Sequence, residues 1–236
     1  MIRISFVLLA LYLLTGCVTH SVQTSNQNPE SSQKIKSMTS AVLIPIKVEV
    51  KESGIGSLEK LPEESAEANR IVKSEVIKAF SNINNVDIVE YSVENEDEQL
   101  LFDDYVGLYQ RVAVSAENIQ YMGPAWSDRK SFNYTLGNGL SYLKDKTGSD
   151  KAIFIYGEDI VTSGGKKALA ALAMIGGIGV NPGGIAVLHI GVVDLDTGHL
   201  LWSNSSASQG LSLDSEKSVK SAIAEILSTS PLTTGK

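Results

Sequence analysis

"IAVLHIGVVDLDTGHLLWSNSSA", residues 185–207, decides the fold class of this chain. Two apolar segments flank Asp196-Thr197-Gly198, and each segment is long enough for a strand. A glycine at the end of such a turn can take the left-handed conformation that a three-residue hairpin loop requires. The stretch therefore predicts two neighbouring antiparallel strands, and with them a sheet at the centre of the domain.

Three further segments predict strands. KAIFIYGEDIV (151–161) and VDIVEY (86–91) are short runs rich in β-branched and aromatic residues. AVLIPIKVEV (41–50) alternates, and a single strand there would place five side chains on one face: Val42, Ile44, Ile46, Val48 and Val50. The sequence thus predicts a sheet of about five strands.

Four segments carry apolar residues at helical spacing: 62–80, 98–121, 131–147 and 214–230. The first opens with Pro62 and acidic residues, as a helix start requires. The stripe expected on the second is Leu101, Tyr105, Leu108, Val112 and Ala116, and that on the third is Phe132, Leu136, Leu140 and Leu143, with Gly148 as its stop. The order of elements predicts an α+β fold in which helices pack against a mixed sheet.

The beginning of the chain has the layout of a secretory signal. An uncharged apolar run, Ile4 to Leu14, follows Arg3 and ends in small residues. The run is shorter than the roughly 20 residues that span a bilayer, so we expect residues 1–16 to be a cleaved signal peptide.

Leu14-Thr15-Gly16-Cys17 resembles the bacterial lipobox, and Cys17 is the single cysteine of the chain. The resemblance implies a diacylglyceryl thioether on the Cys17 sulfur, cleavage before it, and acylation of the new amino terminus, with palmitate as a typical chain. Two or three acyl chains anchor a protein firmly. Val18 stands where an aspartate would signal inner-membrane retention, so the outer membrane, on its periplasmic side, is favoured over the inner one.

Composition indicates a folded protein that does not bind nucleic acid. Hydrophobic residues make up 43% and charged residues 20% of the chain, and the net charge is −7. Residues 17–38, polar and without apolar periodicity, are expected to form the acylated cysteine and a flexible tether. Residues 39–229 are expected to form a single domain, and 230–236 a disordered tail.

Three phrases carry a family resemblance: VLIPIKVEV (42–50), the segment from Tyr134 to Gly179, and VVDLDTGHLLWSN (192–204). They resemble a family of proteobacterial lipoproteins related to the curli secretion-channel lipoprotein, the lipoprotein activator of a peptidoglycan synthase, and the amino-terminal domain of TolB. The resemblance covers residues 40–228. It implies a TolB-amino-terminal-domain-like α+β fold used for protein contacts in the cell envelope, with no catalytic residues to carry over.

SGGKKALAALAMIGGIGVNPGG, residues 163–184, is the candidate interaction segment. Its glycines match neither a phosphate loop nor a dinucleotide fingerprint, so no cofactor is expected. Residues 168–180 carry no charge and are too few to cross a bilayer. They could pack in the core, form a subunit interface or dip into the membrane. The interface residues would be Leu169, Leu172, Met174, Ile175 and Ile178.

The sequence offers no catalytic constellation. His20 lies in the expected tether, His189 in an apolar strand, where a core histidine is expected, and His199 follows the hairpin turn. Asp196 is expected to bond the backbone of its own loop. The acidic run 94–104 lacks the spacing of a calcium loop, so no metal is expected.

The sequence therefore predicts a non-enzymatic accessory or scaffold lipoprotein of the outer membrane that binds an envelope protein or itself. One alternative is a subunit of an oligomeric secretion or export assembly. Another is an envelope hydrolase.

Overall fold

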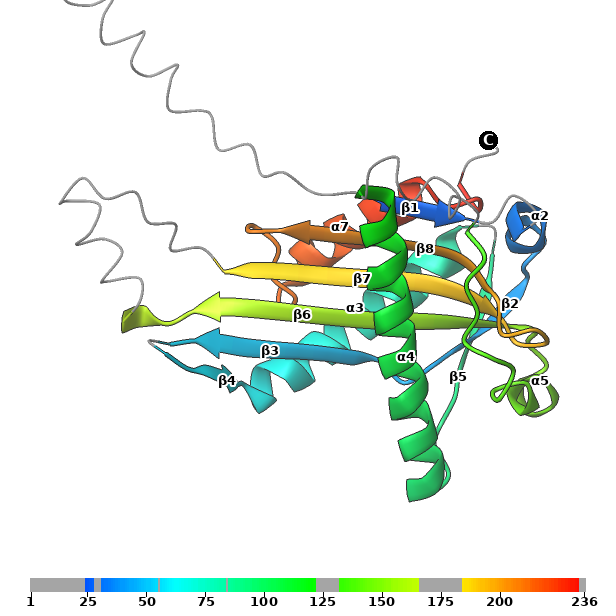
Figure 1. Cartoon of the computed structure of the whole chain (residues 1–236), viewed down its shortest axis with the longest axis horizontal. Helices are drawn as coiled ribbons and strands as arrows, with labels where there is room; N and C mark the ends of the chain where they lie inside the picture. The colour runs from blue at the N-terminus through cyan, green and yellow to red at the C-terminus, as the bar shows by residue number, and fades with distance from the viewer. Residues whose placement is uncertain are drawn as a thin grey trace, which may run out of the picture.

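The structure is a computed structural model, and it describes residues 24–27, 31–54, 56–83, 85–121, 132–165 and 184–233. Within them lies an eight-stranded mixed sheet (Figure 1). Its strands are β1 (Thr24–Gln27), β2 (Ser40–Leu43), β3 (Lys47–Ser53), β4 (Leu58–Lys60), β5 (Asp87–Glu90), β6 (Lys151–Thr162), β7 (Ile185–Asp194) and β8 (Leu200–Ser208). The order is β1-β8-β7-β6-β2-β5, with β3 beside β6 and β4 beside β3.

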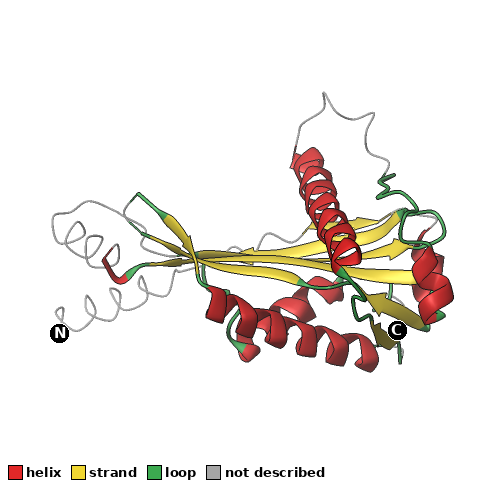
Figure 2. Cartoon of the chain, turned by 90° about the horizontal axis from the view of Figure 1, so that it is seen from below, coloured by secondary structure: helices red, strands yellow, loops and turns green. Residues whose placement is uncertain are grey.

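Helices cover both faces of the sheet. They are α2 (Ser31–Lys36), α3 (Pro62–Asn82), α4 (Glu96–Tyr121), α5 (Tyr142–Thr147) and α7 (Glu216–Ser228). Helices α3 and α7 lie together on one face and α4 crosses the other, so that each face has its own apolar cluster (Figure 2). The predicted α+β fold with a mixed sheet is confirmed.

The central hairpin and its neighbour follow the sequence pattern. Strands β7 and β8 pair in antiparallel fashion, and β7 pairs with β6 in the same way. Gly198 has the positive φ of 70° expected of it, and its N–H donates to the Asp194 carbonyl at 2.7 Å. The expected strand 151–161 is therefore also confirmed, as β6.

The two helices behind the sheet also form where the apolar periodicity predicts them. Helix α3 begins at Pro62, with Glu63 and Glu64 in its first turn. Its buried face includes Ile71, Val72, Val76 and Phe80, and that of α7 includes Val219, Ile223, Ile226 and Leu227.

The expected single strand 41–50 is wrong. Leu43 pairs with Ile153 and Lys47 with Tyr156, so four steps along this chain oppose three along β6. One extra residue around Pro45, which has no N–H to donate, breaks the strand into β2 and β3 and reverses its alternation. Val42 and Ile44 consequently lie in the α4 cluster, whereas Val48 and Val50 lie in the α3–α7 cluster.

The buried stripe of α4 is one residue away from the expected one. Its buried residues are Phe102, Val106, Tyr109, Ala113 and Ala116, whereas Leu108 of the expected stripe is exposed. The two aromatic rings decide the orientation, because they bury the most apolar area. The Tyr109 ring lies 5.3 Å from the Phe154 ring, and its hydroxyl lies 3.2 Å from Ser203 Oγ.

A helix over 131–147 forms only in its last part, as α5. Residues Phe132, Leu136, Leu140 and Leu143 are all buried, but the chain before α5 is not helical. The Leu136 N–H donates to Gly198 O, and Leu200 N–H donates to Tyr134 O, so this segment is paired with the hairpin turn. Gly148 ends α5 in the left-handed conformation, as expected.

The segment expected to be a flexible tether contains two elements. Strand β1 pairs with β8, and α2 buries Ile35, which is 0% exposed. We call residues 24–36 the arm. Within the described arm, β1 is paired along the edge of β8 and α2 packs through Ile35. At the other end, Ser230 and Leu232, in the segment expected to be a disordered tail, are buried.

Candidate functional site

The residues singled out from the sequence lie outside the described residues. These are Cys17 and the five candidate interface residues Leu169, Leu172, Met174, Ile175 and Ile178. The structure does place the strands that flank the interface segment. Ile160 of β6 pairs with Ile185 of β7, so the chain leaves and re-enters the sheet at neighbouring positions.

Two large apolar side chains are exposed at this end of the sheet. Ser53 of β3 pairs with Thr162 of β6 and with Leu58 of β4, which brings Leu58 to the same end as Ile185. Leu58 is 53% exposed and Ile185 is 51% exposed. We call this end the sheet tip, and Figure 2 shows it projecting beyond the helices.

A second exposed apolar surface lies on α4, on the side turned away from the sheet. Leu100, Leu108 and Val114 are 63%, 40% and 38% exposed. These residues lie along about 21 Å of the helix, at a rise of about 1.5 Å per residue. We call this side the outer face of α4. Large apolar side chains gathered on one face are typical of a contact surface.

The hairpin turn holds its acidic residues in structural roles. Asp194, not Asp196, bonds the loop, because its Oδ1 accepts from the Thr197 N–H at 3.1 Å and from the Thr197 hydroxyl at 3.0 Å. Burial raises the pKa of Asp194, but the bond from Lys34, the charge of Lys151 and the Thr197 donors outweigh burial and hold it below its ordinary value. Asp196 instead accepts two bonds from Lys144 at 2.8 Å.

The two described histidines differ in their surroundings. His189 is 3% exposed within β7, which confirms that it is a core residue, and His199 forms a bridge with Thr135. Among the described residues, no three His, Cys, Asp or Glu side chains are grouped closely enough to hold a metal ion. None of the described helices is both long enough and apolar enough to span a bilayer.

A charged ladder lies on the α4 side of β3 and β6. Glu49 and Glu158 are directly opposite in the register, and the Lys51 ammonium lies between them, 2.9 Å from Glu49 and 2.5 Å from Glu158. Lys60 also bonds Glu49, at 2.8 Å. The Lys60 bond, opposed by burial and supported by Lys51, lowers the pKa of Glu49 to about 2. Burial and Glu158 raise the pKa of Tyr156 to about 12. The ladder is therefore internally neutralised.

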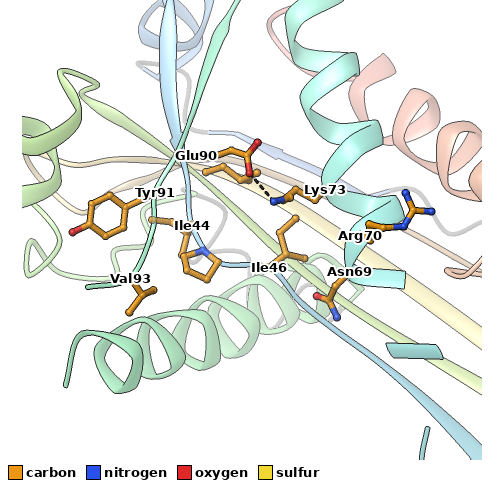
Figure 3. Close-up of a pocket in the computed structure, with 10 residues that line it drawn as sticks. Ile44, Ile46, Asn69, Arg70, Lys73, Glu90, Tyr91 and Val93 are labelled. Atoms are coloured by element: carbon orange, nitrogen blue, oxygen red, sulfur yellow. Dashed lines mark hydrogen bonds and ion pairs between the residues drawn. The ribbon is translucent and has the colours of Figure 1, made fainter. Parts of the chain in front are cut away.

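A groove of about 460 Å³ lies where β2 and β5 end, beside α3 (Figure 3). Its apolar floor includes Ile44 and Ile46, and Lys73 and Glu90 form an ion pair across it at 2.6 Å. Sequence reasoning missed the role of Asn69 at its edge. The Asn69 side chain accepts from the Val48 N–H at 3.0 Å and donates to the Val48 carbonyl at 2.8 Å, which is how a neighbouring strand would bond β3.

The charges around this groove are already paired. Arg70 is bonded to Glu67 at 2.6 Å, as Lys73 is to Glu90, so the groove presents balanced charge over an apolar floor. The groove is open to solvent and its charged side chains already bond one another. Such a site is better suited to contact with another protein surface than to proton transfer or to binding an anion. The described residues thus offer contact surfaces, among which the outer face of α4 carries three of the exposed large apolar side chains.

Comparisons with known proteins give structural similarity only. The chain matches no family model and no curated protein. Among solved structures, it is similar to the PelC dodecamer from Paraburkholderia phytofirmans, with a TM-score of 0.40 and 11% identity over 92% of this chain and 100% of that one. It is also similar to a variant of that dodecamer, with a TM-score of 0.37 and 12% identity over 91% and 99% of the two chains.

Proposed function

We propose that this protein is a lipid-anchored, non-enzymatic subunit of an oligomeric assembly in the bacterial cell envelope. The observation that carries the proposal is the outer face of α4, where Leu100, Leu108 and Val114 stand exposed on one side of a single helix. In a chain with a net charge of −7, such a face is costly to leave in water and is explained by contact with protein.

The attachment to the membrane is proposed from Cys17. Acylation of this residue would hold the assembly on the outer membrane, facing the periplasm, because Val18 does not provide the inner-membrane signal. Replacement of Val18 by aspartate should move the protein to the inner membrane, as measured by density-gradient separation of the two membranes. Mass spectrometry of the mature protein should find acyl chains on Cys17, and an unmodified thiol would contradict the proposal.

The arm brings the domain close to the bilayer. Six residues lie between Cys17 and Thr24, and β1 begins at Thr24. At about 3.5 Å per extended residue, the β1 edge of the sheet can stand no more than about 25 Å from the lipidated sulfur. A tether of some twenty free residues would have allowed a much larger distance between the domain and the bilayer. A ring or row of such subunits would therefore lie along the membrane surface with the same edge facing the lipid.

We also propose that the protein has no enzymatic activity. The contacts of the candidate acids and histidine support this proposal. Asp194 holds the hairpin turn, Asp196 is bonded to Lys144, and His189 is buried within the sheet. Each of these side chains is engaged in the fold, whereas His199 of the hairpin stands exposed.

Light scattering coupled to size-exclusion chromatography of the mature protein tests the proposal. We expect a mass of several subunits that falls on dilution. A monomer at all concentrations would overturn it. The second candidate function, an accessory scaffold for a different envelope protein, is favoured by the separate groove beside α3. It predicts a monomer that elutes in a stoichiometric complex with that partner when purified from envelope membranes.

A further inference from the structure

A second groove lies on the opposite face of the molecule from α4. It runs between α3 and α7 and has a volume of about 400 Å³. Its apolar lining consists of Ala79, Ile83, Ile223, Ala224 and Leu227. Its rim carries charge of both signs, with Lys78, Lys220 and Glu216 among the lining residues.

The outer face of α4 has the complementary pattern. Asp104 and Arg111 alternate with the exposed Leu100, Leu108 and Val114. Neither Asp104 nor Arg111 forms an ion pair with any residue that the structure describes, and the same is true of Lys220. These three charged side chains are therefore available to form ion pairs with another molecule.

Gly107 is a further sign that another surface approaches this helix. It lies in the middle of α4, where glycine is less favourable than alanine. A Cβ at this position would meet no described atom within 4 Å, so packing within the described chain does not require the glycine. Absence of a side chain beside Leu108 lets a neighbouring surface approach the α4 backbone.

We propose that α4 of one copy lies in the α3–α7 groove of the next copy, antiparallel to α7. The spacing supports this arrangement. Leu100 lies one helical turn before Asp104, and Ala224 lies one turn after Lys220, each about 6 Å. With Asp104 opposite Lys220, Leu100 reaches the apolar lining beside Ala224.

The second charged contact falls at the other end of the pair. Arg111 lies about 10 Å from Asp104, and Glu216 lies about 6 Å from Lys220 along α7. The long arginine side chain spans the difference, so Arg111 meets Glu216. Leu108 then lies between the two charged contacts and over the groove. Opposite charges thus meet at both ends of an apolar contact, which fixes the register of the two helices.

This contact is head-to-tail, because α4 and the α3–α7 groove lie on opposite faces of the sheet (Figure 2). Every copy then carries one helix and one groove. Such contacts produce a closed ring when the rotation between copies closes, and a row when it does not. The inference rests on the proposed function and adds to it the identity of the partner, which is a second copy of this chain.

A charge exchange tests the contact. Asp104→Lys and Lys220→Glu should each weaken assembly of the full acylated protein at least tenfold, measured as the dissociation constant in detergent by sedimentation. The doubly exchanged chain, Asp104→Lys with Lys220→Glu, should assemble within about threefold of the original protein, because every contact regains opposite charges. Asp145→Lys, an exposed reversal on α5, is the matched control and should leave assembly unchanged.

The outcomes separate the two proposals. If the original protein assembles but the single variants assemble equally well, or if the double variant is no better than the singles, the α4–groove contact is overturned and the proposed function stands. If the original protein is a monomer throughout, both are overturned. Thermal unfolding of each variant at monomer concentrations should show the same midpoint as the original protein, which ensures that a loss of assembly is not a loss of fold.

Discussion

Replacement of Lys51 by methionine would remove the positive charge that separates two carboxylates. Glu49 and Glu158 face each other across β3 and β6, and Lys51 contacts both. Methionine keeps most of the length and apolar volume of the lysine side chain. The variant therefore isolates the charge, and its effect should appear in both the size and the pH dependence of the free energy of unfolding.

The size follows from two contributions. Two carboxylates at the strand spacing of about 5 Å repel by about 3 kcal/mol at an effective dielectric constant of about 20. The fall in the pKa of Glu49 from 4.5 to about 2 corresponds to about 3 kcal/mol at neutral pH, to which Lys60 and Lys51 both contribute. Water that enters the site, and protonation of one carboxylate, would reduce this repulsion. We therefore expect the free energy of unfolding to fall by about 2 to 4 kcal/mol at pH 7.

The pH dependence should change sign. In the original protein the pKa of Glu49 is lowered by folding, so its contribution is fully present above about pH 4.5 and is lost as the pH falls toward about 2. In Lys51→Met the two facing carboxylates raise the pKa of one of them above its unfolded value. The variant should therefore become more stable between pH 7 and pH 5, where the original protein does not gain stability from this site.

Urea unfolding at pH 7, 6, 5 and 4, followed by circular dichroism, measures both effects. Lys60→Met is the control, because Lys60 is 67% exposed and bonds Glu49 alone in the ladder. Although its bond to Glu49 is the largest cause of the lowered pKa, solvent screens it, and we expect a loss of no more than about 1 kcal/mol. An unfolding free energy of Lys51→Met within 0.5 kcal/mol of the original at every pH, with the error of extrapolation in mind, would refute the reasoning.

Three further changes test other parts of the molecule. Asn69→Ala removes both bonds to the Val48 backbone and should cost about 2 kcal/mol in urea unfolding, and an unchanged value would show that water replaces the side chain. Ile35→Ala in α2 should lower the free energy of unfolding by about 2 kcal/mol and should increase hydrogen exchange in the arm more than in the rest of the sheet. An equal increase in the arm and in the rest of the sheet would show that the arm does not open independently. Leu172→Glu, in the segment proposed as an interface, should leave a folded monomer and reduce assembly in light scattering; global unfolding would instead place Leu172 in the core.

The elements that the sequence predicted well are those with one dominant apolar face. Helices α3 and α7 each have polar residues opposite a continuous apolar stripe, so their buried faces can be read directly from the spacing. The β7–β8 hairpin carries its own turn signal in Gly198. In each case the local sequence pattern agrees with the tertiary packing, so the pattern alone predicts which residues are buried.

The elements that were mispredicted have apolar residues on more than one side. Helix α4 offers two adjacent stripes, and the choice between them depends on Tyr109, whose ring lies over Gly191 of β7. A Cβ at Gly191 would come within 2.6 Å of that ring. This complementarity between distant residues cannot be seen in the spacing of α4 itself. The same holds for the extra residue around Pro45, since the alternation of apolar residues continues through it while the register with β6 changes.

The misassigned stripe of α4 also bears on function. Of the residues that periodicity alone would bury, Leu101 and Val112 pack at the border of the α4 cluster, whereas Leu108 lies exposed on the side that the aromatic rings turn away from the sheet. A helix with apolar residues on two sides can bury one side against its own domain and the other side against a neighbouring molecule. The failure of the simple amphipathic pattern is therefore informative, because a helix that served the domain alone would need polar residues at positions 100, 108 and 114. The surplus of apolar residues on α4 is the feature of the sequence that points to self-assembly.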